Sequence, residues 1–220
     1  MLEQILQYIR SWISHSDQRL VIGISGHGAA GKTTFAHKLM DRLRPIVTNY
    51  VNTDPYIISS EVRKHAFIDY RYEGEQHRYK MTACHPAAHH VPSLERDIQM
   101  IRDGLDLYTM DTHYMKSSMI SSDNQITIVE GMTAAFVKPE LFDLTIYFYT
   151  DDETELVRRF GRDIVERGTD RNYLIQSHHE RRVQYQVFMH PYREQFDLIV
   201  RVNRDGEYIE KNILESQIHK

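Results

Sequence analysis

A glycine-rich segment carries the clearest chemistry in the sequence. Residues 26–33 read GHGAAGKT and fit the pattern G-x-x-x-x-G-K-[ST]. In this pattern backbone N–H groups wrap a phosphate, the lysine reaches the β- and γ-phosphates, and the hydroxyl binds Mg²⁺. The expected nucleotide-binding residues are Gly26, His27, Gly28, Ala29, Ala30, Gly31, Lys32, Thr33 and Thr34. A strand-like run before the segment and a helical pattern after it favour this reading over an ordinary glycine-rich turn.

Two carboxylates follow predicted strands. Asp54 comes after the run 46–52, and Glu130 comes after the run 126–129. Ligands bind at the carboxyl ends of strands in an open α/β sheet. Asp54 could therefore accept a proton from an attacking hydroxyl or hold Mg²⁺ through water. Glu130 could hold Mg²⁺ with Thr33, partly through water. The alternatives are an Asp-Pro turn and a solvated glutamate at a strand end.

Arginines gather in the stretch 152–171. They are Arg158, Arg159, Arg162, Arg167 and Arg171. Arginines that close over a moving phosphoryl group stabilise the charge spread over it. Acidic residues in the same stretch leave a solvated, ion-paired helix as the alternative. Beside a phosphate-binding segment we favour an arginine-rich lid.

The composition is that of an ordinary globular chain. Of 220 residues, 41% are hydrophobic and 26% are charged, which suits one domain spanning 1–220. The net charge of −4 argues against a general nucleic-acid binder. No apolar run is long enough to cross a membrane. The single cysteine, Cys84, allows no internal disulfide, so we expect a cytoplasmic protein.

Elements that must position these residues can be placed along the chain. We expect strands at 20–25, 46–52, 126–129, 144–149 and 198–202, and helices at 2–13, 32–43, 94–101, 153–167, 173–188 and from about 208. Ser93 is a plausible N-cap for the helix at 94–101. Alternating strands and helices predict an α/β fold with a mainly parallel sheet. Residues 55–92 look like an insertion on the acceptor side.

Histidines cluster within that insertion. Cys84, His85, His89 and His90 could suggest zinc, but neighbouring prolines argue against a regular helix carrying the ligands. We therefore expect loop side chains near the acceptor pocket. His178 and His179 are expected to be solvated.

Taken together, residues 20–202 resemble the uridine kinase/phosphoribulokinase family of P-loop kinases. The matching residues are Ile24-Ser25-Gly26, Gly31-Lys32-Thr33-Thr34, Asp54, His85-Pro86, Val129-Glu130-Gly131, Leu141-Phe142-Asp143, Thr150-Asp151, Arg158-Arg159, Arg162-Asp163 and Glu166-Arg167-Gly168. The resemblance implies a P-loop NTPase-type three-layer sandwich that uses ATP and Mg²⁺ to phosphorylate a nucleoside or a related small alcohol.

The resemblance also implies particular residue roles. Asp54 would be the base, with Lys32 and Arg159 beside it in catalysis. Glu130 would help to hold Mg²⁺. Arg159, Arg162 and Arg167 would contact phosphates from the lid. The implied partner is a small-molecule acceptor, with homo-oligomers possible and neither nucleic acid nor membrane involved.

The sequence departs from the family's pattern on the acceptor side. Cys84 stands where an aspartate is usual, Ala87-Ala88 replace Asp-Ala, and residues 107–114 lack the nucleoside-contacting motif. A thiol is a weaker hydrogen-bonding group than a carboxylate. We therefore predict that uridine is a poor acceptor. Two alternatives stay open at this point: a nucleotide-binding regulatory module that has lost its acceptor, and a P-loop hydrolase.

Overall fold

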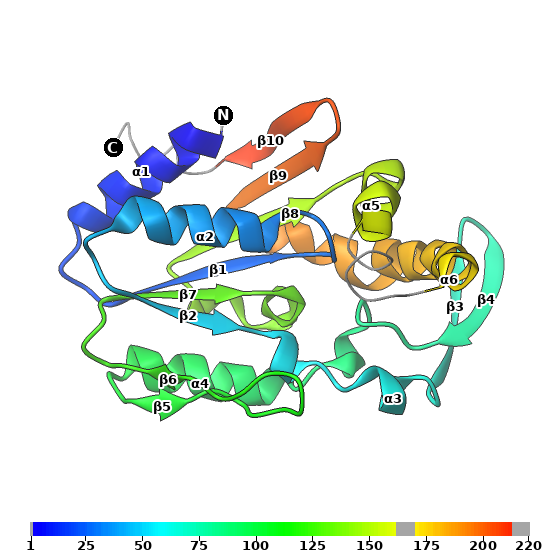
Figure 1. Cartoon of the computed structure of the whole chain (residues 1–220), viewed down its shortest axis with the longest axis horizontal. Helices are drawn as coiled ribbons and strands as arrows, with labels where there is room; N and C mark the ends of the chain where they lie inside the picture. Colours follow the sequence, from blue (N-terminus) through cyan, green and yellow to red (C-terminus); the bar gives the residue numbers. More distant parts are fainter. Residues whose placement is uncertain (1, 162–169, 213–220) are drawn as a thin grey trace.

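The computed structural model of the chain describes residues 2–161 and 170–212. A six-stranded sheet forms the centre of the molecule. Its order is β10-β9-β8-β1-β7-β2, and every neighbouring pair is parallel except β9 and β10 (Figure 1). The strands are β1 (Leu20–Gly26), β2 (Thr48–Asn52), β7 (Ile126–Glu130), β8 (Leu144–Tyr149), β9 (Leu198–Asn203) and β10 (Gly206–Asn212). The predicted α/β fold with a mainly parallel sheet is confirmed.

Helices cover both faces of this sheet. Figure 1 shows α1 and α2 on one face and α4 on the other. The α-helices are α1 (Leu2–Ser14), α2 (Lys32–Leu43), α3 (Ser60–Arg63), α4 (Val91–Arg102), α5 (Asp152–Arg159) and α6 (Arg171–Gln184). Shorter turns are η1 (Asp54–Tyr56), η2 (Pro86–Ala88), η3 (Met132–Phe136), η4 (Pro139–Leu141), η7 (His190–Gln195) and the π-helical η6 (Tyr185–Met189).

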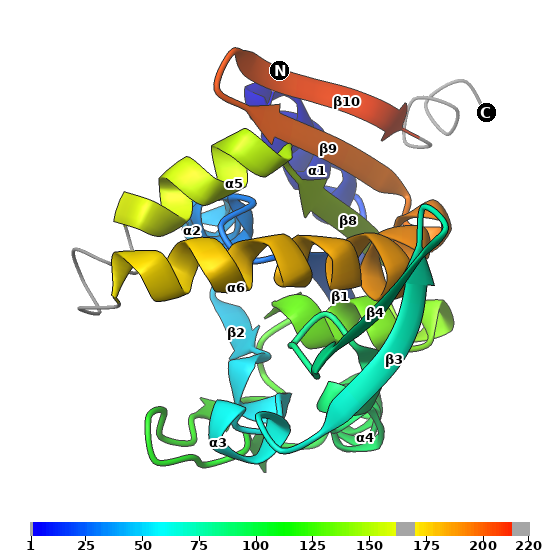
Figure 2. The same cartoon turned by 90° about the vertical axis from the view of Figure 1, so that its right-hand side faces the viewer.

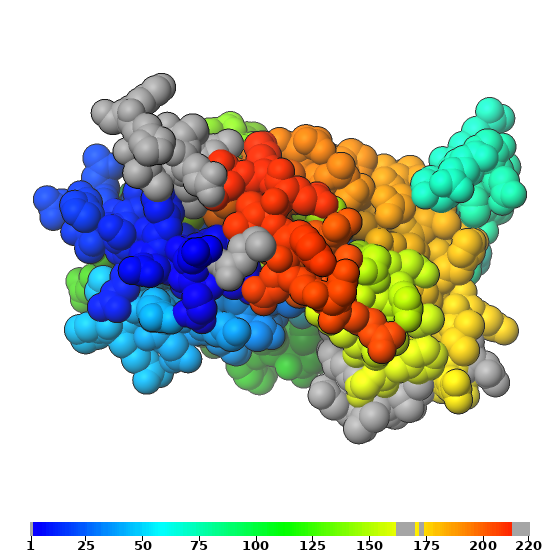
Figure 3. Space-filling view, turned by 90° about the horizontal axis from the view of Figure 1, so that it is seen from above, coloured from blue at the N-terminus to red at the C-terminus, as the bar shows by residue number. Residues whose placement is uncertain are grey.

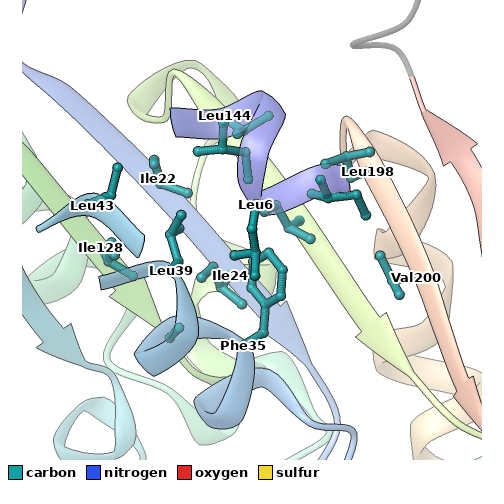
Figure 4. Close-up of a cluster of buried hydrophobic side chains, with 14 of the residues drawn as sticks. Leu6, Ile22, Ile24, Phe35, Leu39, Leu43, Ile128, Leu144, Leu198 and Val200 are labelled. Atoms are coloured by element: carbon teal, nitrogen blue, oxygen red, sulfur yellow. The ribbon is translucent and has the colours of Figure 1, made fainter. Parts of the chain in front are cut away.

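The central strand is buried on both faces, which explains its unbroken hydrophobic sequence. All of β1 is buried. Ile22 and Ile24 pack against α1 and α2, whereas Val21 belongs to the cluster under α4. Figure 4 shows Leu6, Phe35 and Leu39 of the two helices gathered over β1. Successive side chains of a strand point to opposite faces, so one strand supports two cores and three layers result.

Residues 55–92, which the sequence predicts to be an insertion, are built around a hairpin of β3 (Phe67–Tyr72) and β4 (Glu75–Lys80). Figure 2 shows the hairpin alongside α6, and Figure 3 shows it projecting from the body. The Tyr70 hydroxyl donates to Glu180 at 2.6 Å. The fully buried Gln184 amide donates to Lys80 O at 3.0 Å. A second small hairpin, β5 (Leu107–Tyr108) and β6 (Met119–Ile120), lies beside α4.

Two sequence-based expectations about the elements are wrong. The terminal helix expected from about Tyr208 is wrong over residues 208–212, which belong to β10 and pair antiparallel with β9. The rest of that expected helix, 213–220, lies outside the described residues. A tight turn leads into this strand at Gly206, whose φ is +154°, and Ile209 packs against the main core. Strand pairing and burial therefore override the helical pattern.

The expected N-cap at Ser93 is also wrong. Helix α4 begins at Val91 and takes Pro92 into its first turn. A proline fits there because first-turn N–H groups have no helical partner.

Helix ends differ from the prediction elsewhere. The charged helix starts at Asp152 after an Asp151 cap, and residues 162–167 lie outside the described part. The helix expected at 173–188 starts at Arg171 and continues after Gln184 as a π-helical turn. Within residues 2–161 and 170–212, no helix has the length and hydrophobicity needed to cross a bilayer.

Truncating Leu39 tests the core between α2 and the sheet. This side chain is fully buried, so Leu39→Ala should lower the free energy of unfolding by about 2–5 kcal/mol, because it removes methyl groups and leaves a cavity. Urea unfolding measures the change. Val157→Ala, at a side chain that is 48% exposed, should stay within roughly 0.5 kcal/mol. Equal effects at the two positions would contradict this packing.

Candidate active site

The glycine-rich segment turns tightly against β8 before α2 begins. Gly26 has a φ of +135°, and a Cβ at this position would lie 1.8 Å from the Phe148 carbonyl oxygen. Gly31 has a φ of +101° at the N-terminus of α2, and no described side chain caps the helix there. The first N–H groups of α2 are therefore open to an anion, and the helix dipole favours negative charge at this end.

Lys32 and Thr33 begin this helix. The Lys32 side chain is buried, and its Nζ donates to His27 O at 2.8 Å. The Thr33 hydroxyl donates to Glu130 Oε2 at 3.0 Å. Tyr50 donates to the same carboxylate oxygen at 2.7 Å. Burial and the nearby Glu130 raise the pKa of Tyr50, so its hydroxyl stays protonated and fixes the carboxylate.

Thr33 and Glu130 fit a magnesium ion. A hydroxyl and a carboxylate are the hard oxygen ligands that Mg²⁺ prefers. Among the described residues, no group of three or more His, Cys, Asp or Glu side chains could hold a metal. This donor set suits an ion whose remaining ligands are phosphate oxygens and water.

A cavity of about 650 Å³ opens over these groups. Its lining includes Gly28, Ala29, Gly31, Lys32, Thr33, Thr34, Lys38, Asn52, Asp54, Glu130, Arg158 and Arg181. The parallel register pairs Ile24 with Glu130 and Glu130 with Asn52, so the ends of β1, β7 and β2 meet at this edge. The cavity therefore brings together the sequence-predicted phosphate loop and both carboxylates.

Asp54 enters the cavity from the turn after β2. Its backbone N–H is held by Asn52 Oδ1 at 2.8 Å, and its carbonyl accepts the Tyr114 hydroxyl at 2.9 Å. Two side chains thus fix the backbone of the turn, and the carboxylate lies on the exposed side at the cavity wall. The Asp-Pro sequence does form a turn, and this turn places the acid in the cavity.

The arginines of α5 divide between two environments. Arg158 lines the cavity, and its Nη1 donates to Ala29 O at 3.1 Å. Arg159 is buried, and its guanidinium lies 3.4 Å from His178 Nδ1, outside the cavity lining. Arg162 and Arg167 lie outside the described residues. Sequence reasoning did not single out Arg181 of α6, because it is distant in sequence and lies in a helix without a motif.

His27 is a buried structural member of the phosphate loop. Its Nε2 accepts the Thr150 N–H at 3.0 Å, so the ring proton sits on Nδ1 and is donated to Gly28 O at 2.8 Å. The ring meets Tyr185 edge-on at 4.6 Å. Burial lowers the pKa of His27 to about 4, against the opposing effect of Glu155. A neutral histidine therefore joins the loop to the end of β8.

Arg182 completes a charged network behind this histidine. Its Nη1 donates to Glu155 Oε2 at 3.0 Å, and its Nη2 donates to Thr150 O at 2.9 Å. The guanidinium lies 5.0 Å from the Tyr185 ring centre. Helices α5 and α6 are thereby tied to each other and to the phosphate loop through buried groups.

The remaining histidines and Cys84 divide between buried and exposed positions. His178 is buried and lies 2.9 Å from Asp152, so its expected exposure is wrong, whereas His179 is exposed. Cys84 and His89 are buried and do not line the cavity. Burial lowers the pKa of His89 to about 4 and raises that of Cys84.

The buried His27 predicts a loss of stability in acid. Its pKa is about 4 in the folded chain against an ordinary 6.5, so the unfolded chain binds the proton first as the pH falls. Stability is retained above pH 6.5 and lost towards pH 4. The variant His27→Gln keeps a hydrogen-bond acceptor for the Thr150 N–H but has no group that titrates in this range. Between pH 7 and pH 5 the free energy of unfolding should therefore fall by roughly 2 kcal/mol less in the variant than in the wild type. Urea unfolding at both pH values measures this, with the exposed His179→Gln as control. Parallel pH profiles for wild type and His27→Gln would refute the prediction.

Comparisons with known proteins agree with this geometry. Among solved structures, phosphoribulokinase from Rhodobacter spheroides has a TM-score of 0.62 at 14% identity, covering 86% of this chain and 71% of that one. D-glycerate 3-kinase from Cryptococcus neoformans has a TM-score of 0.61 at 10% identity, covering 95% and 99%. These likenesses concern the fold.

Sequence relatives indicate the family to which the chain belongs. A uridine kinase of Lactobacillus helveticus is 29% identical over 197 residues, covering 84% of this chain and 87% of the relative. Uridine-cytidine kinase B of Dictyostelium discoideum is 26% identical over 201 residues, covering 87% and 75%. The model of the Phosphoribulokinase / Uridine kinase family matches residues 21–208. The chain is therefore a P-loop kinase that belongs to the phosphoribulokinase/uridine kinase family.

Proposed function

We propose that this chain is an ATP-dependent kinase that transfers the γ-phosphoryl group to a hydroxyl of a small molecule. The observation that carries the proposal is the single cavity shared by the phosphate loop, the Thr33–Glu130 pair and the Asp54 carboxylate. Nucleotide-binding groups and a potential base for the acceptor thus face the same space. A module that only binds a nucleotide has no need of a base at this position.

The nucleotide phosphates would be held by the loop and by the first turn of α2. Open N–H groups and the helix dipole would bind the oxygens, and Lys32 would leave the His27 carbonyl to meet the transferring phosphate. Thr33 and Glu130 would hold Mg²⁺, which neutralises charge on the phosphate oxygens when it is bound.

Asp54 would act on the acceptor. As the acceptor oxygen bonds to the γ-phosphorus, its proton passes to the carboxylate and the bond to the ADP oxygen breaks. The rigid turn that carries Asp54 supports such a role because the base is held in place before the substrate arrives.

Arginines would complete the site. Arg158 already lies at the cavity wall, so it is well placed to contact a phosphate oxygen. We propose that Arg162 and Arg167 add further phosphate contacts from the lid. Arg159 would act through a change of side-chain position, since it lies against His178 here.

An ADP-release assay with and without acceptors separates the candidate activities. A kinase releases ADP only when an acceptor is present and yields a product heavier by one phosphoryl group. A hydrolase releases ADP without any acceptor, and a regulatory module binds ATP without turnover. Uridine belongs in the acceptor panel, and a kcat/KM above ~10⁴ M⁻¹s⁻¹ for it would contradict the predicted change of acceptor.

Replacing Lys32 tests the phosphate contact. Lys32→Ala should lower kcat by about 10²–10³-fold while the fold is retained, because it removes a cation from the charge that develops on the transferring phosphate. Steady-state kinetics, with circular dichroism as a check of folding, measures the effect. Lys138→Ala removes a cation exposed on the surface and should leave kcat unchanged. A folded Lys32→Ala enzyme within a few-fold of wild-type activity would reject the assignment.

Replacing Asp54 tests the base. Asp54→Asn should bind ATP–Mg²⁺ normally and lose about 10²–10⁴-fold in kcat, because the amide cannot accept the proton. Nucleotide titration and single-turnover kinetics separate the two quantities. Asp103→Asn, on an exposed carboxylate after α4, is the matched control. A variant that loses ATP binding but keeps its kcat would make Asp54 a metal ligand.

A further inference from the structure

The guanidinium of Arg63, at the end of α3, uses only part of its N–H donors in hydrogen bonds to the backbone. Its Nε donates to Ile58 O at 2.8 Å and its Nη1 to Met81 O at 3.1 Å. A guanidinium carries five N–H donors. These two bonds therefore hold the side chain in place and leave other N–H donors for a ligand. No carboxylate of residues 2–161 or 170–212 forms an ion pair with Arg63.

Arg181 is a second arginine of this kind. It lines the cavity, and its Nη2 lies 3.8 Å from the position that a Cβ on Gly28 would take. Its Nε is buried and has no hydrogen-bond partner in the described part of the chain. A buried donor without a partner costs free energy, and such an atom beside a cavity indicates a place for a ligand.

Hydrogen bonds tie Arg63 and the helix that carries Arg181 to one short segment of the chain. Gln184 follows Arg181 by one helical turn, and its Nε2 donates to Lys80 O at 3.0 Å. Arg63 binds the next carbonyl along the chain, that of Met81. The short segment 80–81 is thus held from one side by Arg63 and from the other by the helix that carries Arg181.

Asp54 lines the same cavity as Arg181. The Tyr114 hydroxyl donates to the Asp54 carbonyl at 2.9 Å. Burial raises the pKa of Tyr114, the charge of Asp54 raises it further, and the charge of Arg63 opposes the rise. Burial, followed by the charge of Arg181, lowers the pKa of Arg63. The two arginines therefore repel each other beside the carboxylate that would receive the acceptor's proton.

We propose that Arg63 and Arg181 form an anion subsite, so that the acceptor is a small alcohol bearing a phosphate or a carboxylate. The inference rests on the proposed kinase function and names its substrate class. An anion between the arginines would supply the missing partner of Arg181 and relieve the repulsion, through charge-assisted hydrogen bonds. A neutral nucleoside would leave both charges unpaired.

The charge of the acceptor can be measured without knowing its identity. A small-molecule cell extract is separated by anion exchange into neutral and anionic fractions. Each is incubated with the enzyme and ATP–Mg²⁺, and ADP and phosphorylated products are followed by mass spectrometry. We expect transfer only with the anionic fraction. Pairs such as glycerol and D-glycerate, or D-ribose and D-ribose 5-phosphate, then distinguish a carboxylate from a phosphate.

Substitution of Arg63 tests the subsite directly. Arg63→Gln should raise KM for the anionic acceptor about 10–150-fold, the equivalent of one hydrogen bond to a charged group, and leave KM for ATP unchanged. Arg63→Lys keeps the charge and should restore part of the loss. Arg78→Gln, an exposed arginine on β4 of the same insertion, should match the wild type.

The possible outcomes distinguish a failure of the anion subsite from a failure of the proposed kinase function. Transfer to the neutral fraction overturns the anion subsite and leaves the kinase standing. An Arg63→Gln enzyme with equal losses for ATP and acceptor shows a purely structural role and also overturns the subsite. No transfer with either fraction overturns the kinase proposal and the inference together.

Discussion

The close approach of Gly26 to β8 is the constraint on which the site depends. A side chain there would overlap the Phe148 carbonyl, so only glycine lets the chain turn directly from the central strand into the phosphate loop. That turn places His27 against Thr150 and leaves the N-terminus of α2 facing the cavity. The loop is therefore shaped by backbone packing before any ligand binds.

The electrostatics of the site follow from this placement. His27 is buried deeply enough to remain uncharged, so it adds no cation of its own behind the loop. Arg182 and Glu155 balance each other nearby, at 3.0 Å. Positive charge that faces the cavity comes instead from Lys32, Lys38, Arg158 and Arg181. This separation keeps paired charges inside the fold and exposes cations where phosphates would bind.

Much of this arrangement could be predicted from the sequence, because local patterns encode it. The hydrophobic run of β1, the loop motif and the carboxylates at strand ends each depend on neighbouring residues, and the parallel sheet brings them together. Arg181 could not be found this way, since its role depends on how α6 packs. His178 and the terminal strand at Tyr208 were missed for the same reason: tertiary burial and strand pairing decide them.

Gln184 has a consequence for how the two sides of the cavity can move. Its buried amide uses both ends, accepting from the Thr82 N–H and hydroxyl and donating to Lys80 O and Tyr70. Breaking this set would strand several polar groups away from water, at roughly 1–3 kcal/mol for each. Helix α6 and the hairpin therefore behave as one rigid body. Arg182 joins the same helix to Thr150, which in turn holds His27 of the phosphate loop. A displacement of the hairpin is therefore transmitted through α6 to the phosphate loop.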